Sequence, residues 1–370
     1  MPTILWQREG GGTRLRKTAG LGRMGDMDAT SPAQTRAMAA ESAVVRRYVH
    51  RYGPLAWAHA ATPGVDGART WHYWWHAHLL HVLRDAQEHR PDPRRARLLR
   101  RLHHGITVRT LGRWTTPFYD DVAWMALALQ RYDVHDRRID HLTRRLDDAV
   151  DPAVGALPWA VGSALYNAPA NGPAAIALAW SAHRGSAVDL DAWVAATLDD
   201  PETGLVRDGV EHGVVRPELW TYNQGVAIGS ALALAEGAPD ADAREAHEAR
   251  AASLVHAVAR WCAADDGLFP AAGGGDGGLF AGILARYLAE AALWFADDVS
   301  SETHRPVADV ARELVHRNAE ALWNGRRGGI FPADPRRAAR ASGDDLDLSV
   351  QVGAWITLEA DVDLERAFTS

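Results

Sequence analysis

Two aspartates stand side by side in the segment TTPFYDDVAWMALAL, residues 115–129. Asp120 and Asp121 follow aromatic residues and precede an apolar helical pattern, and the segment holds no Lys or Arg. Two carboxyl groups that share a weakly polar site cannot both ionise at low cost, so one keeps its proton to higher pH while the other stays an anion. Glycoside hydrolysis uses this division, because it needs an acid for the leaving oxygen and a carboxylate for the anomeric carbon.

The position of the pair in a helix allows a second interpretation. Thr116 fits the N-cap and Pro117 the first helical position, which predicts Asp120 and Asp121 in the first turn and a half. Acidic residues there often only complement the helix dipole. Five other Asp-Asp pairs lack the aromatic flanks. They lie in turns, near predicted helix ends and in an acidic loop, at residues 147–148, 199–200, 265–266, 297–298 and 344–345.

Composition sets the broad class of protein. The 370 residues are 47% hydrophobic and include 15 Trp, which is ample for a folded core. The net charge is -7, and we interpret Arg clusters such as RRARLLRR as a solvated helix face, so no nucleic-acid partner is expected. Cys262 is the single cysteine, so we expect no disulfide framework and no Cys-rich zinc site. We expect a core role for its thiol, and we expect the protein to use no metal and no cofactor.

The first 31 residues are rich in Gly, Arg and Thr without periodicity, and we expect them to form a disordered leader. They lack the continuous apolar core of a signal peptide, and no charge-free apolar run is long enough to span a bilayer. We therefore expect a soluble, cytoplasmic monomer without a membrane partner. Met24 or Met27 as the true start is an alternative.

The remaining residues, 32–370, predict a single all-α domain of about twelve helices, with no segment that demands a strand. The firmest helical patterns begin at Trp71 and at Phe280. So many helices suggest helix pairs closed into a ring, because an α-solenoid would show a fixed repeat, which is absent. Further helices are predicted near residues 32–52, 94–104, 118–132, 136–149, 173–184, 189–198, 222–236, 241–264, 302–323 and 347–360.

Two predicted loops carry aromatic and amide side chains. Sugars stack their CH faces on aromatic rings and need planar hydrogen-bonding partners for their hydroxyl groups. Covering the core is the alternative role for any one of these aromatic residues. The loop residues are Trp159, Tyr166, Asn167 and Asn171 in PWAVGSALYNAPANGP, and Trp220, Tyr222, Asn223 and Gln224 in ELWTYNQGV.

These segments resemble glycoside hydrolase family 76, the endo-α-1,6-mannanases. The matching motifs are YDDVAWMALAL, ALPWAVGSALYNAPANGPAAIALA, WTYNQGVAIGSALAL and DGGLFAGILARYLAE, in the family's order. The resemblance implies an (α/α)6 barrel and a retaining hydrolase of α-1,6-linked mannan or mannooligosaccharides. Asp120 would be the nucleophile and Asp121 the acid/base. The substrate-binding residues implied are Trp75, Tyr119, Trp159, Tyr166, Asn167, Asn171, Tyr222, Asn223, Gln224 and Asp276.

Other constellations suggest alternative functions. His72 and His76 have the i, i+4 spacing of a helical metal pair, but no third ligand is evident, so we expect solvated or hydrogen-bonded histidines. A sugar epimerase or isomerase on the same barrel would need paired His bases, which the loop motifs lack. A carbohydrate-binding protein without catalytic activity is the third hypothesis, and the intact Asp pair argues against it.

Overall fold

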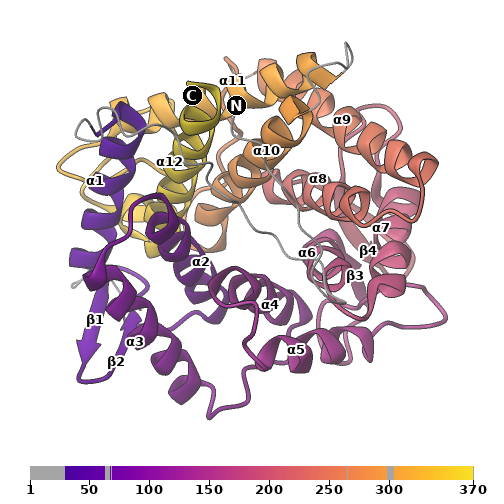
Figure 1. The fold of residues 1–370 in the computed structure, drawn as a ribbon, viewed down its shortest axis with the longest axis horizontal. Helices are drawn as coiled ribbons and strands as arrows, with labels where there is room; N and C mark the ends of the chain where they lie inside the picture. The colour runs from indigo at the N-terminus through magenta and orange to yellow at the C-terminus, as the bar shows by residue number, and fades with distance from the viewer. Residues whose placement is uncertain (1–29, 63–66, 68, 265, 298–303, 370) are drawn as a thin grey trace.

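The computed structural model describes residues 30–62, 67, 69–264, 266–297 and 304–369. Within these ranges, twelve α-helices alternate between an inner and an outer ring (Figure 1). The inner helices are α2 (Tyr73–His89), α4 (Tyr119–Tyr132), α6 (Ala168–Ala179), α8 (Thr221–Glu236), α10 (Phe280–Asp297) and α12 (Leu348–Phe368). The outer helices are α1 (Pro32–Arg47), α3 (Pro93–Arg109), α5 (Arg138–Asp147), α7 (Arg184–Leu198), α9 (Ala241–Ala263) and α11 (His304–Gly325).

Each inner helix packs on the next, and α12 returns to pack on α2, which closes the ring. The predicted (α/α)6 barrel is therefore confirmed. Helices α6 and α8 are apolar on nearly every side because inner helices are covered all round. The segment Gly275–Asp297, which contains α10, is apolar and long enough to cross a membrane, but 72% of its most apolar window is buried in the barrel.

Glycines set the distance between α12 and the chain at the start of α10, from Gly278 to Gly282. A Cβ added at Gly353 would lie 2.2 Å from the carbonyl oxygen of Gly278. One added at Gly282 would lie 2.5 Å from the carbonyl oxygen of Gly353. Because the opposing atoms belong to the backbone, they cannot rotate away, and only glycine allows this close approach.

The prediction that no strands occur is wrong. The strands are three to six residues long, too short to show a clear alternation. The first hairpin follows α1 directly, so the predicted helix 32–52 ends early, at Arg47. The last hairpin turns at His212 and Gly213, both at positive φ (50° and 78°), as in a type I′ turn. The strands are β1 (Val49–Tyr52), β2 (Leu55–Ala58), β3 (Leu165–Asn167), β4 (Arg207–Glu211) and β5 (Val214–Leu219).

Two further sequence predictions concern where segments begin and end. The helix predicted at 173–184 instead begins at Ala168, because Asn167 caps it by accepting a hydrogen bond from the Ala170 amide, and Pro173 lies inside it. Residues 1–29 of the predicted leader lie outside the described residues. Ser31, the last residue of the predicted leader, is instead the N-cap of α1, and its side chain accepts a hydrogen bond from the Gln34 amide.

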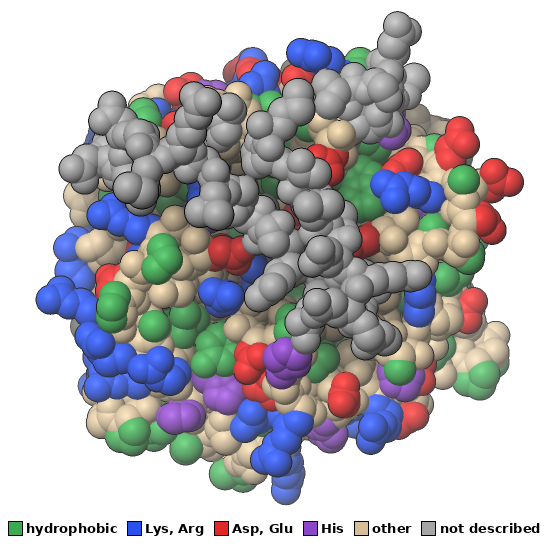
Figure 2. All heavy atoms as spheres, viewed as in Figure 1, with side chains coloured by type: hydrophobic (Ala, Val, Ile, Leu, Met, Phe, Trp, Pro, Cys, Tyr) green, Lys and Arg blue, Asp and Glu red, His purple; other side chains and the backbone are tan. Residues whose placement is uncertain are grey.

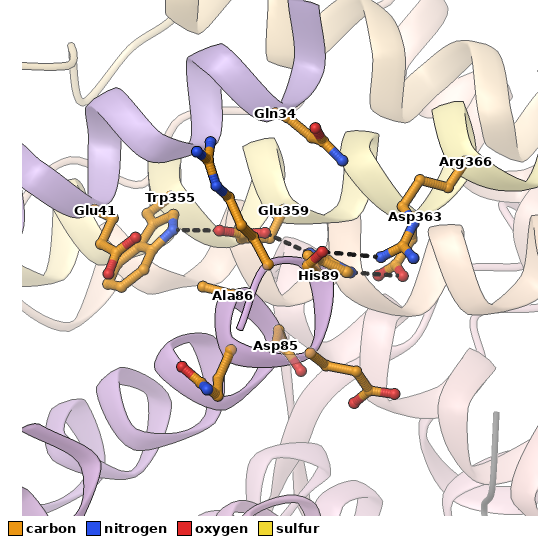
Figure 3. A network of polar contacts seen from close by, with 12 residues as sticks. Gln34, Glu41, Asp85, Ala86, His89, Trp355, Glu359, Asp363 and Arg366 are labelled. Carbon is orange, nitrogen blue, oxygen red and sulfur yellow. Dashed lines mark hydrogen bonds and ion pairs between the residues drawn. The ribbon is translucent and has the colours of Figure 1, made fainter. Parts of the chain in front are cut away.

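A buried ion cluster stabilises the seam where α2 meets α12 (Figure 3). His89, at the end of α2, contacts Glu359 (Nδ1 to Oε2, 2.6 Å) and Asp363 (Nε2 to Oδ1, 2.9 Å) on α12. The Trp355 indole donates to the second Glu359 oxygen at 2.8 Å. Burial alone would lower the pKa of His89, but the two carboxylates overcome it and raise that pKa to about 10. His89 is therefore a cation at neutral pH.

We predict that His89→Gln destabilises the barrel by about 3 kcal/mol at pH 7. Because folding raises the pKa of His89 above its usual value, its stabilisation is complete below about pH 6.5 and disappears as pH rises through about 10. Urea unfolding of both proteins from pH 6 to 10 measures the difference. His316→Gln is the control, since His316 pairs with Asp361 but is half exposed. A pH-independent loss in His89→Gln would contradict the ionic role.

Candidate active site

The N-termini of the inner helices meet at one end of the barrel. An outer helix returns the chain after each inner helix, so the inner helices run in the same direction (Figure 1). Phe280, the first residue of α10, stacks on Tyr222 of α8 with ring centroids 3.8 Å apart and 8° between planes. Its ring also lies beside that of Trp74 on α2, with the ring centroids 6.4 Å apart. We call this end the catalytic end, because Asp120 and Asp121 lie there in the first turn of α4.

Helix α4 begins later than the sequence predicts. Its N-cap is Phe118 rather than Thr116, and no side chain caps it. The chain stays extended to Phe118 because the Val161 amide donates to the Pro117 carbonyl and the Tyr119 amide donates to the Trp159 carbonyl, each at 2.9 Å. This backbone pairing fixes the helix start and brings the 159–161 loop against it.

The same pairing gives each aspartate its own hydrogen-bonding partners. The Trp159 indole Nε1 donates to Asp120 Oδ2 at 2.9 Å, and the Asp121 backbone amide donates to Asp120 Oδ1 at 2.7 Å. The Thr116 hydroxyl, freed from capping, donates to Asp121 Oδ2 at 2.9 Å. Asp120 thus has a bond at both oxygens, whereas Asp121 receives one through a hydroxyl.

Both carboxyl groups hold their protons more tightly than usual. Burial raises the pKa of Asp120 to about 6, against the lowering effect of its two hydrogen bonds. Burial and the neighbouring Asp120 charge raise the pKa of Asp121 to about 7. No cation among the described residues contributes to either shift. Near neutral pH the pair therefore holds an anion and an acid.

Asp345, from another Asp-Asp pair, shows the contrasting case. Its side chain is also buried, and burial alone would raise its pKa. The Arg337 guanidinium, 2.7 Å away, and the amides of Ala333 and Arg340 instead lower that pKa. A buried aspartate with a cation is an ordinary structural anchor, so the absence of a cation distinguishes Asp120 and Asp121.

Asp276 is a third carboxylate at the catalytic end. The indoles of Trp74 and Trp75 both donate to its Oδ1, at 3.0 and 2.9 Å. Asp276 itself is exposed, and its charge contributes to the raised pKa values of Asp120 and Asp121. Trp75 is buried, so it positions Asp276 and does not offer a free ring face.

A fourth carboxylate, Asp208 on β4, lies beside α8. Asn223 is fully buried and its Nδ2 lies 3.5 Å from Asp208 Oδ1, while its Oδ1 has no partner. Burial raises the pKa of Asp208. Burial, and after it the charges of Asp208, Asp120 and Asp276, raise the pKa of Tyr222. These residues give the site acceptor oxygens next to an aromatic surface.

Other predicted site residues serve the framework. The Asn171 and Gln224 side chains are fully buried and bond to the backbone of Leu157 and Val206, which braces two loops. In this structure the two side chains brace the loops, and their direct contact with a sugar stays a prediction. Asn167 caps α6, the Tyr166 hydroxyl donates to Asp151 at 2.7 Å, and Tyr119 lies under the Arg145 guanidinium.

Sequence reasoning missed several residues of the catalytic end. Trp74 and Phe280 adjoin predicted residues in their motifs, so a closer look at those motifs could have found them. Thr116 was assigned to capping, and Asp208 carries no local signal, because β3–β4 pairing brings it to the site.

The remaining candidates behave as ordinary structural residues. His76 is buried, accepts a hydrogen bond from the Ala58 amide at 2.9 Å, and contacts the His72 carbonyl, so the expectation of hydrogen bonding is confirmed for His76. Cys262 is buried in the core, as predicted. Among the described residues, no group of three or more His, Cys, Asp or Glu side chains could hold a metal ion.

An (α/α)6 barrel with carboxyl groups and aromatic rings at one end is an arrangement suited to a glycoside hydrolase. The model of glycosyl hydrolase family 76 matches residues 36–330. The chain belongs to this family and is a glycoside hydrolase.

Solved structures agree with this assignment. The α-1,6-mannanase GH76A from Salegentibacter sp. HEL1_6 is 25% identical, with a TM-score of 0.77 over 89% of this chain and 98% of that chain. An inactive variant of that enzyme, with two consecutive aspartates replaced by alanine, was solved with α-1,6-mannotetrose (TM-score 0.78). The Lin0763 protein from Listeria innocua is 21% identical, with a TM-score of 0.77 over 91% of this chain and 99% of that one. No curated protein sequence matches the chain.

We predict that Asp121→Asn increases stability at pH 8 by about 1 kcal/mol. Folding raises the pKa of Asp121 to about 7, so the native state loses stability as pH rises from about 4 to about 7, and the amide removes this penalty. Urea unfolding at pH 8 and pH 4 measures the gain, which should vanish at pH 4. Asp148→Asn, at an exposed position, is the control. Equal gains in both variants would contradict the explanation.

Proposed function

We propose that the protein is a retaining, endo-acting hydrolase of α-1,6-linked mannan or mannooligosaccharides. The observation that carries this proposal is the cation-free Asp120–Asp121 pair at the start of α4. Support comes from the Salegentibacter α-1,6-mannanase, whose inactive variants replace two consecutive aspartates. The indole, hydroxyl and amide donors around the pair suit glycoside chemistry, in which the charge on each carboxyl group changes during the reaction.

The hydrogen bonds support separate roles for the two acids. Asp120 receives the Trp159 indole and the Asp121 amide, and both donors stabilise its anion, as a nucleophile requires. Asp121 lies next to that anion. Burial and the negative charge of Asp120 raise the pKa of Asp121, so Asp121 keeps its proton, as a general acid requires. Because the residues are consecutive, their carboxyl groups can flank a single glycosidic bond. Retaining enzymes have a shorter distance between the two carboxyl groups than inverting enzymes, so the consecutive positions favour a retaining mechanism.

The proposed reaction has two steps. Asp121 gives its proton to the glycosidic oxygen while an Asp120 oxygen attacks the anomeric carbon, which forms a glycosyl ester and releases the leaving sugar as an alcohol. Asp121, now an anion, takes a proton from water, and the hydroxide displaces Asp120. Asp276 and Asp208 accept hydrogen bonds from sugar hydroxyl groups, and the rings of Tyr222 and Phe280 offer a surface for CH groups.

We predict that Asp121→Asn lowers kcat/KM on α-1,6-mannooligosaccharides by about 10²- to 10⁴-fold, and that Asp120→Asn lowers it at least as much. The amide can neither donate the proton nor attack the sugar. Chromatography of the products from mannotetraose and longer substrates measures activity and separates internal from terminal cleavage. Asp148→Asn is the control. Full activity in either active-site variant would refute the proposed roles, and epimerised sugar without cleavage would favour an isomerase.

We predict a bell-shaped dependence of kcat/KM on pH, with a maximum between about 6 and 7. Activity falls below this range because Asp120 becomes protonated, and above it because Asp121 loses its proton. Trp159→Phe removes a hydrogen bond that lowers the pKa of Asp120, so the acidic limb should move to higher pH. Trp323→Phe, on α11, is the control. An unchanged acidic limb in Trp159→Phe would show that another group controls it.

A further inference from the structure

The outer helix α3 and the turn after it carry an unusual charge distribution. Residues 93–113 contain seven Arg and two His but no Asp or Glu, in a chain whose net charge is -7. Figure 2 shows Arg and His side chains gathered at the lower left of the molecule, over β1, β2 and α3. The sequence alone led us to regard these arginines as a solvated helix face, and the structure adds two observations to that interpretation.

The first observation is the lack of neutralisation. Arg95 points inward and pairs with Glu41 at 2.6 Å. Within the described part of the chain, Arg94, Arg97 and Arg100 are exposed and have no carboxylate at ion-pair distance, nor does the half-buried Arg101. Elsewhere many arginines are paired, for example on α9 and α11. A hollow beside α3 is lined by Arg100, His104, His135 and Arg137 together with Asp133 and Asp136, so basic groups outnumber the acidic groups there but do not stand alone.

The second observation is a pair of exposed aliphatic side chains at the end of the same surface. Residues 94, 97, 101, 104 and 108 follow one stripe along α3. The stripe ends in Val108, which is 52% exposed, and Leu111, just beyond the helix, is 81% exposed. Leu111 has φ 52°, a conformation that disfavours a bulky residue, and it projects from the turn that follows the helix. We call Arg94, Arg97, Arg100, Arg101, His104, Val108 and Leu111 the α3 face.

Arginines and exposed aliphatic groups on one face suit a particular partner. A soluble polyanion such as nucleic acid would gain from the charges but not from Val108 and Leu111. An anionic lipid surface gains from both, because phosphate headgroups attract the arginines while the aliphatic groups enter the interface. We propose that the α3 face docks the protein reversibly on anionic membranes, as a peripheral contact that needs no membrane-spanning segment.

The location of the α3 face gives the contact a use. Residues 110–114 lead directly from α3 to the segment that begins at Thr115 and holds the Asp pair, so the end of the face that carries Val108 and Leu111 is the end nearer in the chain to the catalytic end. If the proposed glycanase function holds, docking would keep the catalytic end close to glycans displayed on the same surface. Docking itself does not depend on that function.

Sedimentation of the full chain with lipid vesicles tests the proposal. We expect binding to vesicles of phosphatidylcholine with 30% phosphatidylglycerol, weakening with added salt, and none to pure phosphatidylcholine. The variant Arg94→Glu/Arg97→Glu/Arg100→Glu should bind at least about 100-fold more weakly. Arg244→Glu/Arg312→Glu/Arg317→Glu, with the same charge change on α9 and α11, should bind as the wild type does. Val108→Ser/Leu111→Ser should also weaken binding at unchanged charge.

Two results would overturn the proposal directly: no binding to anionic vesicles, or an equal loss of vesicle binding in the α9/α11 control variant. A third result would be that the wild type binds heparin as strongly as vesicles while Val108→Ser/Leu111→Ser still binds vesicles fully. The last result would identify a general polyanion surface. Circular dichroism verifies that each variant is folded. Hydrolysis of mannooligosaccharides in solution should be unchanged in all variants, so a failure of docking is distinguishable from a failure of the proposed enzymatic function.

Discussion

Two carboxyl groups on consecutive residues lie largely out of water at the start of α4, where no cation among the described residues neutralises them. Such a site would favour two neutral acids, and the surrounding structure prevents this for one of them. The Trp159 indole and a backbone amide hold Asp120 as an anion, while Asp121 has a single hydroxyl donor. The unequal number of donors divides one dipeptide into an anion and an acid.

The barrel supplies these donors from segments far apart in sequence. Trp159 arrives because its loop pairs with residues 117–119, and Asp276 is held by indoles from α2. Inner helices that run in one direction place their first turns, with free amide groups and positive dipole ends, at the catalytic end. The packing that forms the core therefore also positions the chemistry, and close contacts such as Gly282 on Gly353 fix the spacing between the helices.

The sequence predicted those features that are encoded locally. The helices were found because apolar periodicity is a property of each segment, and the Asp pair because its aromatic flanks are adjacent to it. The short strands and Asp208 were missed because they depend on pairing between segments. The backbone bonds of Asn171 and Gln224 were also missed, since a sequence cannot show whether an amide faces solvent or a backbone turn. The cytoplasmic location stays a prediction.

The seam between α2 and α12 has a consequence for how the protein is made. His89 and Glu359 are 270 residues apart, and the catalytic end draws on α2 as well as on the segment before α10. A growing chain can pair neighbouring helices as they emerge, but the ring cannot close until α12 has left the ribosome. Until then the faces of α2 and α10 that α12 covers stay exposed, so the catalytic end can be complete only after α12 has been made.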